Sequence, residues 1–585
     1  MKTPFLRLKG MMVLGAAAVV MLATAESQAQ ALKVIPPPMA YPKGQVYKNN
    51  PVAWNEFLAT LPHRTYDAKT VGADAPPPTS GGTWAEVTTN TDSGVASNGL
   101  SNPRLLQDGT VLFQEAGTQY WWKLTPDNMG NYVDGTWTQV ATLPVISGTQ
   151  YAPLYFASGV LPDGKVIIEG GEYQDFTPTW TNMGAIYDPV ANTWTAVSPP
   201  SGWGYNSSGD GVIGDSESIV LNDGTFMLGG CCNYPDTTTG NALLDESSLT
   251  WTFTGAPNAG GDYQDEQGYN LLPNGNVLTV DIWTYYPANE NPTNAEQYDY
   301  SSGTWISAGN TPVSLVDPAK CGTFEIGPAV MRPDGTLLAF GGNTGCKGVP
   351  SLDPTAIYNT GSGTWTAGKN VPAVCGSGKT ACDLADAPAA TMPNGNVLFA
   401  ASSGYGDSPT HFFEYTTTGV IKQTGDTLLY ASESGAYYYD FLVLPTGQVL
   451  TTDFSNTPEV YTPVGSPNAA WAPVITEING KAPPGNVTHG DTYTLSGTQF
   501  NGLTQGAAFG DDEQGATNYP IVRLTNKSSG HVFYARTTNP NTASIAPGVA
   551  TSASFTVPET MELGQAELAV IANGIASKNV QVVVK

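Results

Sequence analysis

The chain has 585 residues, of which 50 are acidic, 23 are basic and 4 are histidines, so its formal net charge is -27 at pH 7. A surface this acidic repels phosphate groups, which argues against nucleic acids and anionic membranes as partners. Only 12% of the residues are charged, whereas 66 are glycines and 45 are prolines, a composition typical of short strands joined by tight turns.

The N-terminus has the pattern of a secretory signal peptide over residues 1–31. Three basic residues precede an apolar run at 11–25, and Ala29-Gln30-Ala31 is a small-x-small cleavage site. The run is too short to span a membrane as a helix. We therefore expect the protein to be exported and cleaved near Ala31, and to be secreted, periplasmic or at the cell surface without a membrane span. We also expect it to be a monomer.

Residues 32–80 predict an extended N-terminal arm. Three consecutive prolines occur twice in it, at 36–38 and at 76–78. Proline fixes the backbone φ angle and has no N–H, so such runs favour extended chain over helix or sheet.

Seven turns of the form x-[Asp/Asn/Thr]-Gly interrupt apolar runs between about residues 100 and 460. Their glycines are 51 to 60 residues apart: Gly109, Gly164, Gly224, Gly275, Gly335, Gly395 and Gly447. Asp-Gly and Asn-Gly between apolar stretches are strong hairpin signals, because both residues tolerate positive φ. The period is that of a propeller blade, so each repeat predicts one blade.

The repeats also share a double glycine and, about twenty residues later, a tyrosine followed by Thr-Trp. The double glycines are at 170–171, 229–230 and 341–342, and the pairs are Tyr187 with Trp194, Tyr298 with Trp305 and Tyr358 with Trp365. This spacing resembles the kelch repeat, in which four strands make one blade of a β-propeller.

The Thr-Trp pairs predict how the ring of blades closes. They follow the first five turns, whereas the seventh repeat has none and Thr83-Trp84 stands ahead of the first turn. A strand around Trp84 can complete the last blade and remove exposed sheet edges. We therefore predict a seven-bladed kelch-type β-propeller over residues 81–468.

From Ala472 onward the kelch pattern stops and short alternating strands appear, for example at 492–495, 521–524 and 580–584. About 110 residues with this rhythm predict an immunoglobulin-like β-sandwich over residues 469–585. The predicted fold class is all-β.

A seven-bladed kelch propeller followed by such a sandwich resembles the copper radical oxidases, galactose oxidase and glyoxal oxidase. Residues 506–524 look like the C-terminal loop that reaches down the propeller axis in that family. There, copper is held by two Tyr and two His, one Tyr is cross-linked to a Cys, and three propeller ligands lie eight or nine residues before the hairpin turn.

The family's offset selects one axial position in each repeat of this chain. These are Leu100, Tyr155, Asp215, Glu266, Ile326, Asp386 and the pair Tyr437-Tyr438. Tyr155 and Tyr437 stand at the two Tyr positions, Leu100 stands where the Cys belongs, and Tyr438 stands where a His belongs. The four histidines, at 63, 411, 489 and 531, fall at no ligand position. Because Cu(II) prefers imidazole nitrogen, we do not expect copper or its radical chemistry.

Acidic residues occupy three of these seven positions, where about 0.6 is expected by chance from 50 acids in 585 residues. Asp511 and Asp512 in the C-terminal loop add two more. Three interpretations remain open. The acids tie down strand starts, or Asp215, Glu266 and Asp386 hold a hard cation such as Ca2+, or the acids bind a polar ligand beside Tyr155, Tyr437 and Tyr438.

Six cysteines in an exported protein favour disulfides over a metal site. We predict pairing of Cys321 with Cys346 and of Cys375 with Cys382. The sequence leaves open whether Cys231 and Cys232 form a vicinal disulfide or stay reduced.

The leading functional hypothesis is a secreted galactose-oxidase-like kelch propeller without the copper-radical site. Its acidic axial funnel would bind an extracellular ligand, a carbohydrate in first place. One alternative is an extracellular enzyme, either a glycan hydrolase that uses two carboxylates or an atypical oxidase. Another is a structural docking protein of the cell envelope.

Overall fold

The computed structural model describes residues 34–38, 47–61, 81–88, 96, 98–205, 209–231, 241–255, 266–282, 293–316, 325–342, 353–372, 375, 381–404, 406–509 and 513–585. The predicted signal peptide, Cys321, Cys346, Asp511 and Asp512 lie outside these residues. Antiparallel sheets dominate the described part of the chain, which confirms the all-β class.

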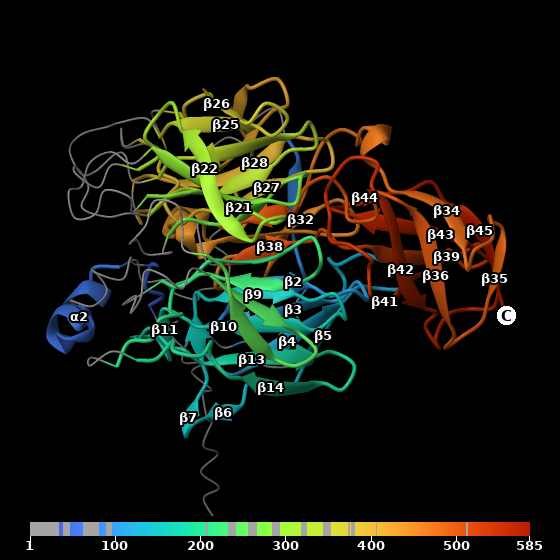
Figure 1. The fold of residues 1–585 in the computed structure, drawn as a ribbon, viewed down its shortest axis with the longest axis horizontal. Helices are drawn as coiled ribbons and strands as arrows, with labels where there is room; N and C mark the ends of the chain where they lie inside the picture. The colour runs from blue at the N-terminus through green and yellow to red at the C-terminus, as the bar shows by residue number, and fades with distance from the viewer. Residues whose placement is uncertain are drawn as a thin grey trace, which may run out of the picture.

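Seven sheets between residues 83 and 462 each contain four consecutive or nearly consecutive strands (Figure 1). The first three are β2 (Leu100–Leu105), β3 (Val111–Glu115), β4 (Trp121–Thr125) and β5 (Thr136–Gln139); β9 (Ala157–Val160), β10 (Val166–Glu169), β13 (Gly184–Asp188) and β14 (Thr193–Val197); and β15 (Ser218–Val220), β16 (Phe226–Leu228), β17 (Ala242–Asp245) and β18 (Thr250–Phe253).

The next two sheets follow the same order. They are β19 (Asn270–Leu271), β20 (Val277–Val280), β21 (Asn294–Asp299) and β22 (Thr304–Asn310); and β23 (Ala329–Met331), β24 (Thr336–Phe340), β25 (Thr355–Asn359) and β26 (Thr364–Ala367). The sixth and seventh are β27 (Ala389–Thr391), β28 (Val397–Ser402), β29 (Thr410–Tyr415) and β30 (Ile421–Gln423); and β31 (Asp440–Val443), β32 (Val449–Thr452), β33 (Glu459–Thr462) and β1 (Thr83–Glu86).

The seven predicted hairpin turns connect the first and second strands of these sheets. All seven turn glycines have φ between +78° and +90°. That left-handed backbone costs glycine little and other residues more, which explains why the turn repeats in the sequence. The first strands of several sheets contact one another, namely β9 and β15, β23 and β27, β27 and β31, and β31 and β2.

The segment around Trp84 pairs with the last sheet, as predicted. β1 runs antiparallel to β33, with Trp84 opposite Tyr461. The Trp84 indole N–H donates to the carbonyl of Gly425 at 2.7 Å, and Trp194 makes the equivalent bond to Ala141 at 2.9 Å. The repeated Trp therefore ties the outer strand of one sheet to its neighbour.

Two further sheets after residue 473 pack face to face. One contains β34 (Val474–Ile478), β36 (Thr492–Thr498), β42 (Ala550–Thr556) and β41 (Thr537–Thr538); the other contains β35 (Gly485–Val487), β45 (Val580–Val584), β43 (Gly564–Ala572), β39 (Ile521–Asn526), β40 (Val532–Ala535) and β44 (Ile575–Ala576). Leu495 and Phe555 from the first sheet and Leu568 and Val582 from the second share one buried core. These two packed sheets are called the sandwich, and the immunoglobulin-like fold predicted for residues 469–585 stays a prediction.

Short elements complete the described chain. They are β6 (Val145–Ile146), β7 (Thr149–Gln150), β8 (Pro153–Leu154), β11 (Tyr173–Gln174), β12 (Thr177–Pro178), β37 (Gly506–Ala508), β38 (Gln514–Ala516), the 3-10 turns η2 (Ala431–Glu433), η3 (Ala436–Tyr438) and η4 (Ala469–Trp471), and the helix α2 (Pro51–Leu58). None of the described helices is long and apolar enough to cross a membrane.

Helix α2 corrects the prediction of a wholly extended arm over residues 32–80. Asn50 caps it by accepting a hydrogen bond from the Ala53 amide at 3.1 Å, and Pro51 occupies the first turn. Both residues are favoured at helix starts, so the signal was present in the sequence. Helix α2 and the sandwich lie on opposite sides of the seven sheets (Figure 1).

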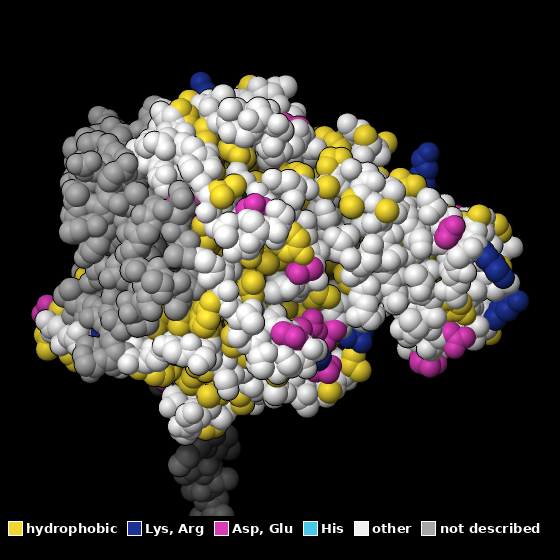
Figure 2. Space-filling view, in the orientation of Figure 1, with side chains coloured by type: hydrophobic (Ala, Val, Ile, Leu, Met, Phe, Trp, Pro, Cys, Tyr) yellow, Lys and Arg dark blue, Asp and Glu magenta, His cyan; other side chains and the backbone are white. Residues whose placement is uncertain are grey.

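One of the two predicted disulfides, Cys375–Cys382, is present. Cys231 is also disulfide-bonded, so it is not a reduced thiol. The face in Figure 2 consists mainly of uncharged side chains and backbone, in line with the low content of charged residues.

Candidate functional site

All predicted axial positions lie where the first strand of a sheet begins. Each is the first residue of such a strand or lies within four residues before it, and each is at most 3% exposed. The residues are Leu100, Tyr155, Asp215, Glu266, Ile326, Asp386, Tyr437 and Tyr438. The offset from the turn therefore located a set of equivalent, buried positions.

Three of these residues have a left-handed backbone. The φ angle is +51° at Tyr155, +60° at Glu266 and +52° at Asp386. For residues with a β-carbon this conformation costs on the order of 1–3 kcal/mol, and it persists only where the surroundings enforce it. The same strained geometry thus recurs at equivalent positions of three different sheets.

An aromatic cluster surrounds Tyr155. Its ring centroid is 6.1 Å from Tyr173 and 6.3 Å from Phe454, and its ring stacks on Phe509 at 6.3 Å with an interplanar angle of 16°. The ring centroids of Tyr437 and Tyr438 are 4.6 Å apart, and those of Tyr438 and Phe454 are 5.6 Å apart. The structure therefore brings three sequence-predicted tyrosines into one cluster.

Phe509 arrives on a hairpin from the C-terminal part of the chain. Strands β37 and β38 pair with each other, and β37 extends the sixth sheet by pairing with β27, with Ala508 opposite Ala389. β37 also contacts β23 and β31. The hairpin therefore contacts the first strands of the fifth, sixth and seventh sheets, and Asp511 and Asp512 follow Phe509 beyond the described residues.

One of the acidic axial residues, Asp215, interacts electrostatically with a tyrosine of the cluster. Burial raises the pKa of the Tyr173 hydroxyl well above its usual value, and the charges of Glu172 and Asp215 raise it further. Asp215 therefore lies within electrostatic reach of Tyr173. Glu266 and Asp386 occupy the equivalent positions of other sheets, and their convergence with Asp215 stays a prediction.

A second carboxylate cluster surrounds the hairpin and was not identified from the sequence as a site. The Asp440 carboxylate accepts hydrogen bonds from the backbone N–H of Asn102 at 2.8 Å and from the Thr452 hydroxyl at 3.0 Å. Burial raises the pKa of Glu513 well above its usual range, the neighbouring Asp440 raises it further, and Arg104 lowers it. Glu513 and Asp440 thus form a buried acid pair beside Arg104.

The predicted N-terminal arm covers the tyrosine cluster. Residues 35–38 are buried, and Ile35 belongs to the same hydrophobic core as Tyr155 and Tyr437. The hydroxyl of Tyr155 donates to the Pro36 carbonyl at 2.9 Å, and that of Tyr173 donates to the Pro37 carbonyl at 2.8 Å. Tyr173 was missed because it lies outside the family's offset.

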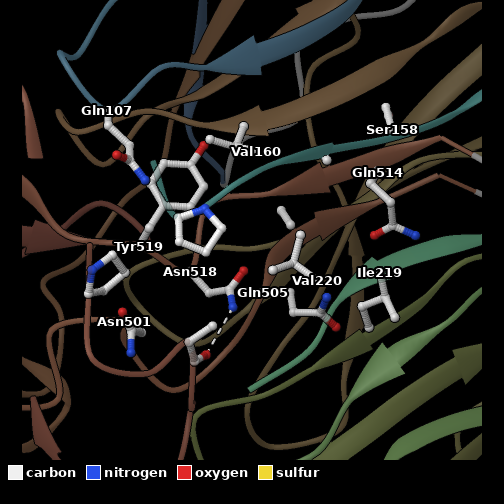
Figure 3. A pocket seen from close by; sticks show the side chains of 15 residues that line it. Gln107, Ser158, Val160, Ile219, Val220, Asn501, Gln505, Gln514, Asn518 and Tyr519 are labelled. Carbon is white, nitrogen blue, oxygen red and sulfur yellow. Dashed lines mark hydrogen bonds between the residues drawn. The ribbon is translucent and has the colours of Figure 1, made fainter. Parts of the chain in front are cut away.

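A small cavity lies near the sandwich, where Ser158 and Ile219 face Gln505, Gln514 and Tyr519 (Figure 3). Its volume is about 30 Å³, which accommodates one or two water molecules and excludes a sugar. Among the residues that the structure describes, no three His, Cys, Asp or Glu side chains are grouped as metal ligands.

No protein-family model and no curated protein matches the chain. Among solved structures, it is similar to a fungal alcohol oxidase of the AA5 family in complex with copper, at 13% identity and a TM-score of 0.44, over 86% of this chain and 99% of that one. It is also similar to YjhT, at 13% identity and a TM-score of 0.37, over 57% and 99%. A third similar structure is the extracellular domain of the B. thetaiotaomicron protein BT4673, at 10% identity and a TM-score of 0.41, over 86% and 60%. These likenesses concern the fold and not a ligand or an activity.

Proposed function

We propose that this chain is an exported, galactose-oxidase-like kelch propeller that binds an extracellular polar ligand, in first place a carbohydrate, in its axial funnel. In this proposal the seven sheets are blades of one ring over residues 81–468, and the immunoglobulin-like sandwich occupies residues 469–585. The observation that carries the proposal is the set of buried acids and tyrosines at equivalent strand starts, three of them with a left-handed backbone.

The chemistry of these residues supports a hydroxyl-rich ligand. Strained backbone in several equivalent positions is typical of binding sites, where it holds a side chain in a required direction. Carboxylates such as Asp215 accept hydrogen bonds from hydroxyl or amine groups, and tyrosine rings pack on the apolar faces of a sugar. A ligand held at Asp215 would lie within electrostatic reach of Tyr173, whose ring contacts that of Tyr155.

The residues at the family's copper positions do not fit copper. Leu100, at the position of the cross-linking Cys, is fully buried and has no sulfur. Tyr438, at a His position, packs its ring against Phe454. Since these residues replace imidazole and thioether groups with a hydrocarbon and a phenol, they favour a site without the copper-radical cofactor.

A hard cation at Asp215, Glu266 and Asp386, as a bridge between the protein and a sugar, would require these carboxylates to come together when it binds, because no three metal-ligand side chains are grouped among the described residues. Ca2+ takes six to eight oxygen ligands, and three carboxylates plus ligand hydroxyls can supply them. A rise in melting temperature with Ca2+ that is absent in the triple variant Asp215→Asn, Glu266→Gln, Asp386→Asn would support this cation, and no rise in the unsubstituted chain would count against it.

The test is binding to a broad glycan panel. Because residues 35–38 cover the tyrosines, the assay uses the full mature chain both intact and cut at a protease site introduced at residues 41–44. We expect binding that Asp215→Asn weakens by about 10- to 100-fold, as for loss of a charged hydrogen bond. The matched control is Glu477→Gln, which removes an exposed carboxylate from β34. Absence of glycan binding by the cut chain would refute the carbohydrate ligand.

A further inference from the structure

Three tyrosine hydroxyls point to three successive carbonyls of the N-terminal arm. Tyr155 donates to Pro36 at 2.9 Å and Tyr173 donates to Pro37 at 2.8 Å. Tyr437 donates to Ile35 at 3.4 Å, the longest of the three bonds. The tyrosines come from separate places in the chain: before β9, in β11 and in η3. Tyrosine hydroxyls from three separate parts of the chain therefore donate hydrogen bonds to one short segment.

The chemistry of a proline run matches this arrangement. Pro36, Pro37 and Pro38 have no backbone N–H, so the segment presents carbonyl acceptors without competing donors. An extended proline helix forms no internal hydrogen bonds, and all its carbonyls are free for a partner. Aromatic surfaces with hydroxyl donors are a general means of recognising such peptides, because the proline ring packs on the aromatic face and the carbonyl takes the hydrogen bond.

Burial keeps the donors in the required protonation state. It raises the pKa of both Tyr155 and Tyr173 well above the usual value, and nearby tyrosines and carboxylates raise it further. Both hydroxyls therefore remain protonated donors throughout the physiological pH range. The binding geometry does not depend on a titration in that range.

A second contact holds the arm beyond the proline run. Trp54 of α2 stacks on Tyr173, with ring centroids 5.8 Å apart and an interplanar angle of 29°. Lys48 forms an ion pair with Asp210, whose side chain is fully buried. The arm therefore contacts Tyr173 both through the proline run and through helix α2, which precede and follow residues 39–46.

We propose that Tyr155, Tyr173 and Tyr437 form a binding site for an extended proline-rich peptide, and that residues 35–38 of the same chain are its resident ligand and close the axial funnel. The chemical class of the ligand is an N–H-free run of backbone carbonyls flanked by apolar side chains. Ile35 supplies the apolar flank, since it is 2% exposed within the tyrosine cluster. This site shares its tyrosines with the proposed glycan site, but it binds its ligand through tyrosine hydroxyls and not through carboxylates, so it does not rest on that function.

The test uses the full mature chain, folded and then cut at the protease site introduced at residues 41–44. Cutting converts the segment from a tethered ligand into a free one, which lowers its effective concentration and allows its release. The released N-terminal fragment is identified by mass spectrometry after size exclusion. Binding of a fluorescein-labelled synthetic peptide of residues 32–40 to the cut chain is then followed by fluorescence anisotropy.

We expect saturable peptide binding that unlabelled peptide competes away. Tyr155→Phe and Tyr173→Phe should each weaken it by about 2- to 13-fold, the effect of one neutral hydrogen bond. Tyr132→Phe is the matched control, because this buried hydroxyl donates to the Gly109 carbonyl instead of to a carbonyl of residues 35–38. A peptide in which Pro36 and Pro37 are alanines should bind more weakly, since alanine is not fixed in the extended form.

Two results would overturn the proposal. One is no peptide binding up to millimolar concentration, and the other is equal binding to the parent cut chain and to the double variant Tyr155→Phe, Tyr173→Phe. Peptide binding without glycan binding would uphold this site and refute the carbohydrate function, whereas glycan binding without peptide binding would do the reverse.

Discussion

Replacing Glu459 with glutamine is expected to flatten the pH dependence of stability above about pH 4.3. Glu459 lies in β33, is 2% exposed and accepts hydrogen bonds from the amides of Leu428 and Leu429 at 2.7 and 2.9 Å. Burial raises its pKa to about 8 even though the two amide bonds lower it. In the unfolded chain a glutamate has a pKa of about 4.3.

The sign of the effect follows from the proton count. Between about pH 4.3 and 8 the folded state keeps the proton on Glu459 and the unfolded state loses it, so the free energy of unfolding falls as pH rises. The fall is about 1.4 kcal/mol per pH unit, or about 4 kcal/mol between pH 4.3 and 7. Stability from this group is fully present below pH 4.3 and is lost as pH rises towards the folded pKa.

The assay is urea unfolding from pH 4.5 to 8, followed by tryptophan fluorescence. Burial also raises the pKa of Glu169 and Glu513, so the parent protein loses stability with rising pH through several groups. The difference between the parent and Glu459→Gln isolates one of them, and Glu477→Gln controls for the loss of a negative charge. Parallel slopes for parent and Glu459→Gln would refute the assignment of a buried, neutral carboxyl group at this position.

Three further predictions concern stability measured by urea unfolding. Trp84→Ala should cost about 3 kcal/mol because its half-buried ring packs on two aromatic rings, whereas Trp84→Phe should cost about 1 kcal/mol for the lost hydrogen bond; equal costs would argue against the ring packing, and no cost for Trp84→Phe would argue against that bond. Asp386→Gly should be more stable than Asp386→Ala by about 1 kcal/mol, because φ is +52° there, and the opposite order would contradict the left-handed backbone. Arg104→Ala should cost about 3–5 kcal/mol by leaving the acid pair without its cation, and adding Glu513→Gln should restore part of that loss; no recovery would show that Arg104 acts through its bond to Ser158 instead.

The sequence predicted those features that depend on local backbone requirements. The turn glycines recur because each needs a positive φ, and Trp84 could be assigned to the last sheet because the repeat left one strand missing. Tyr155 could be placed by its offset from the turn. What the sequence could not predict are contacts between distant segments: residues 35–38 reach the tyrosines across more than 100 residues, and Glu513 meets Asp440 through a hairpin whose register no local pattern fixes.

The proline segment and a sugar would use the funnel residues differently. A tyrosine hydroxyl can donate and accept, whereas a carboxylate such as that of Asp215 only accepts. Pro36, Pro37 and Pro38 have no N–H, so the segment accepts hydrogen bonds from the tyrosine hydroxyls but offers no hydrogen-bond donor to the carboxylates. A ligand with hydroxyl or amine groups satisfies both kinds of residue. Such a ligand should therefore displace the segment from the cut chain, while a second proline-rich peptide should only exchange with it.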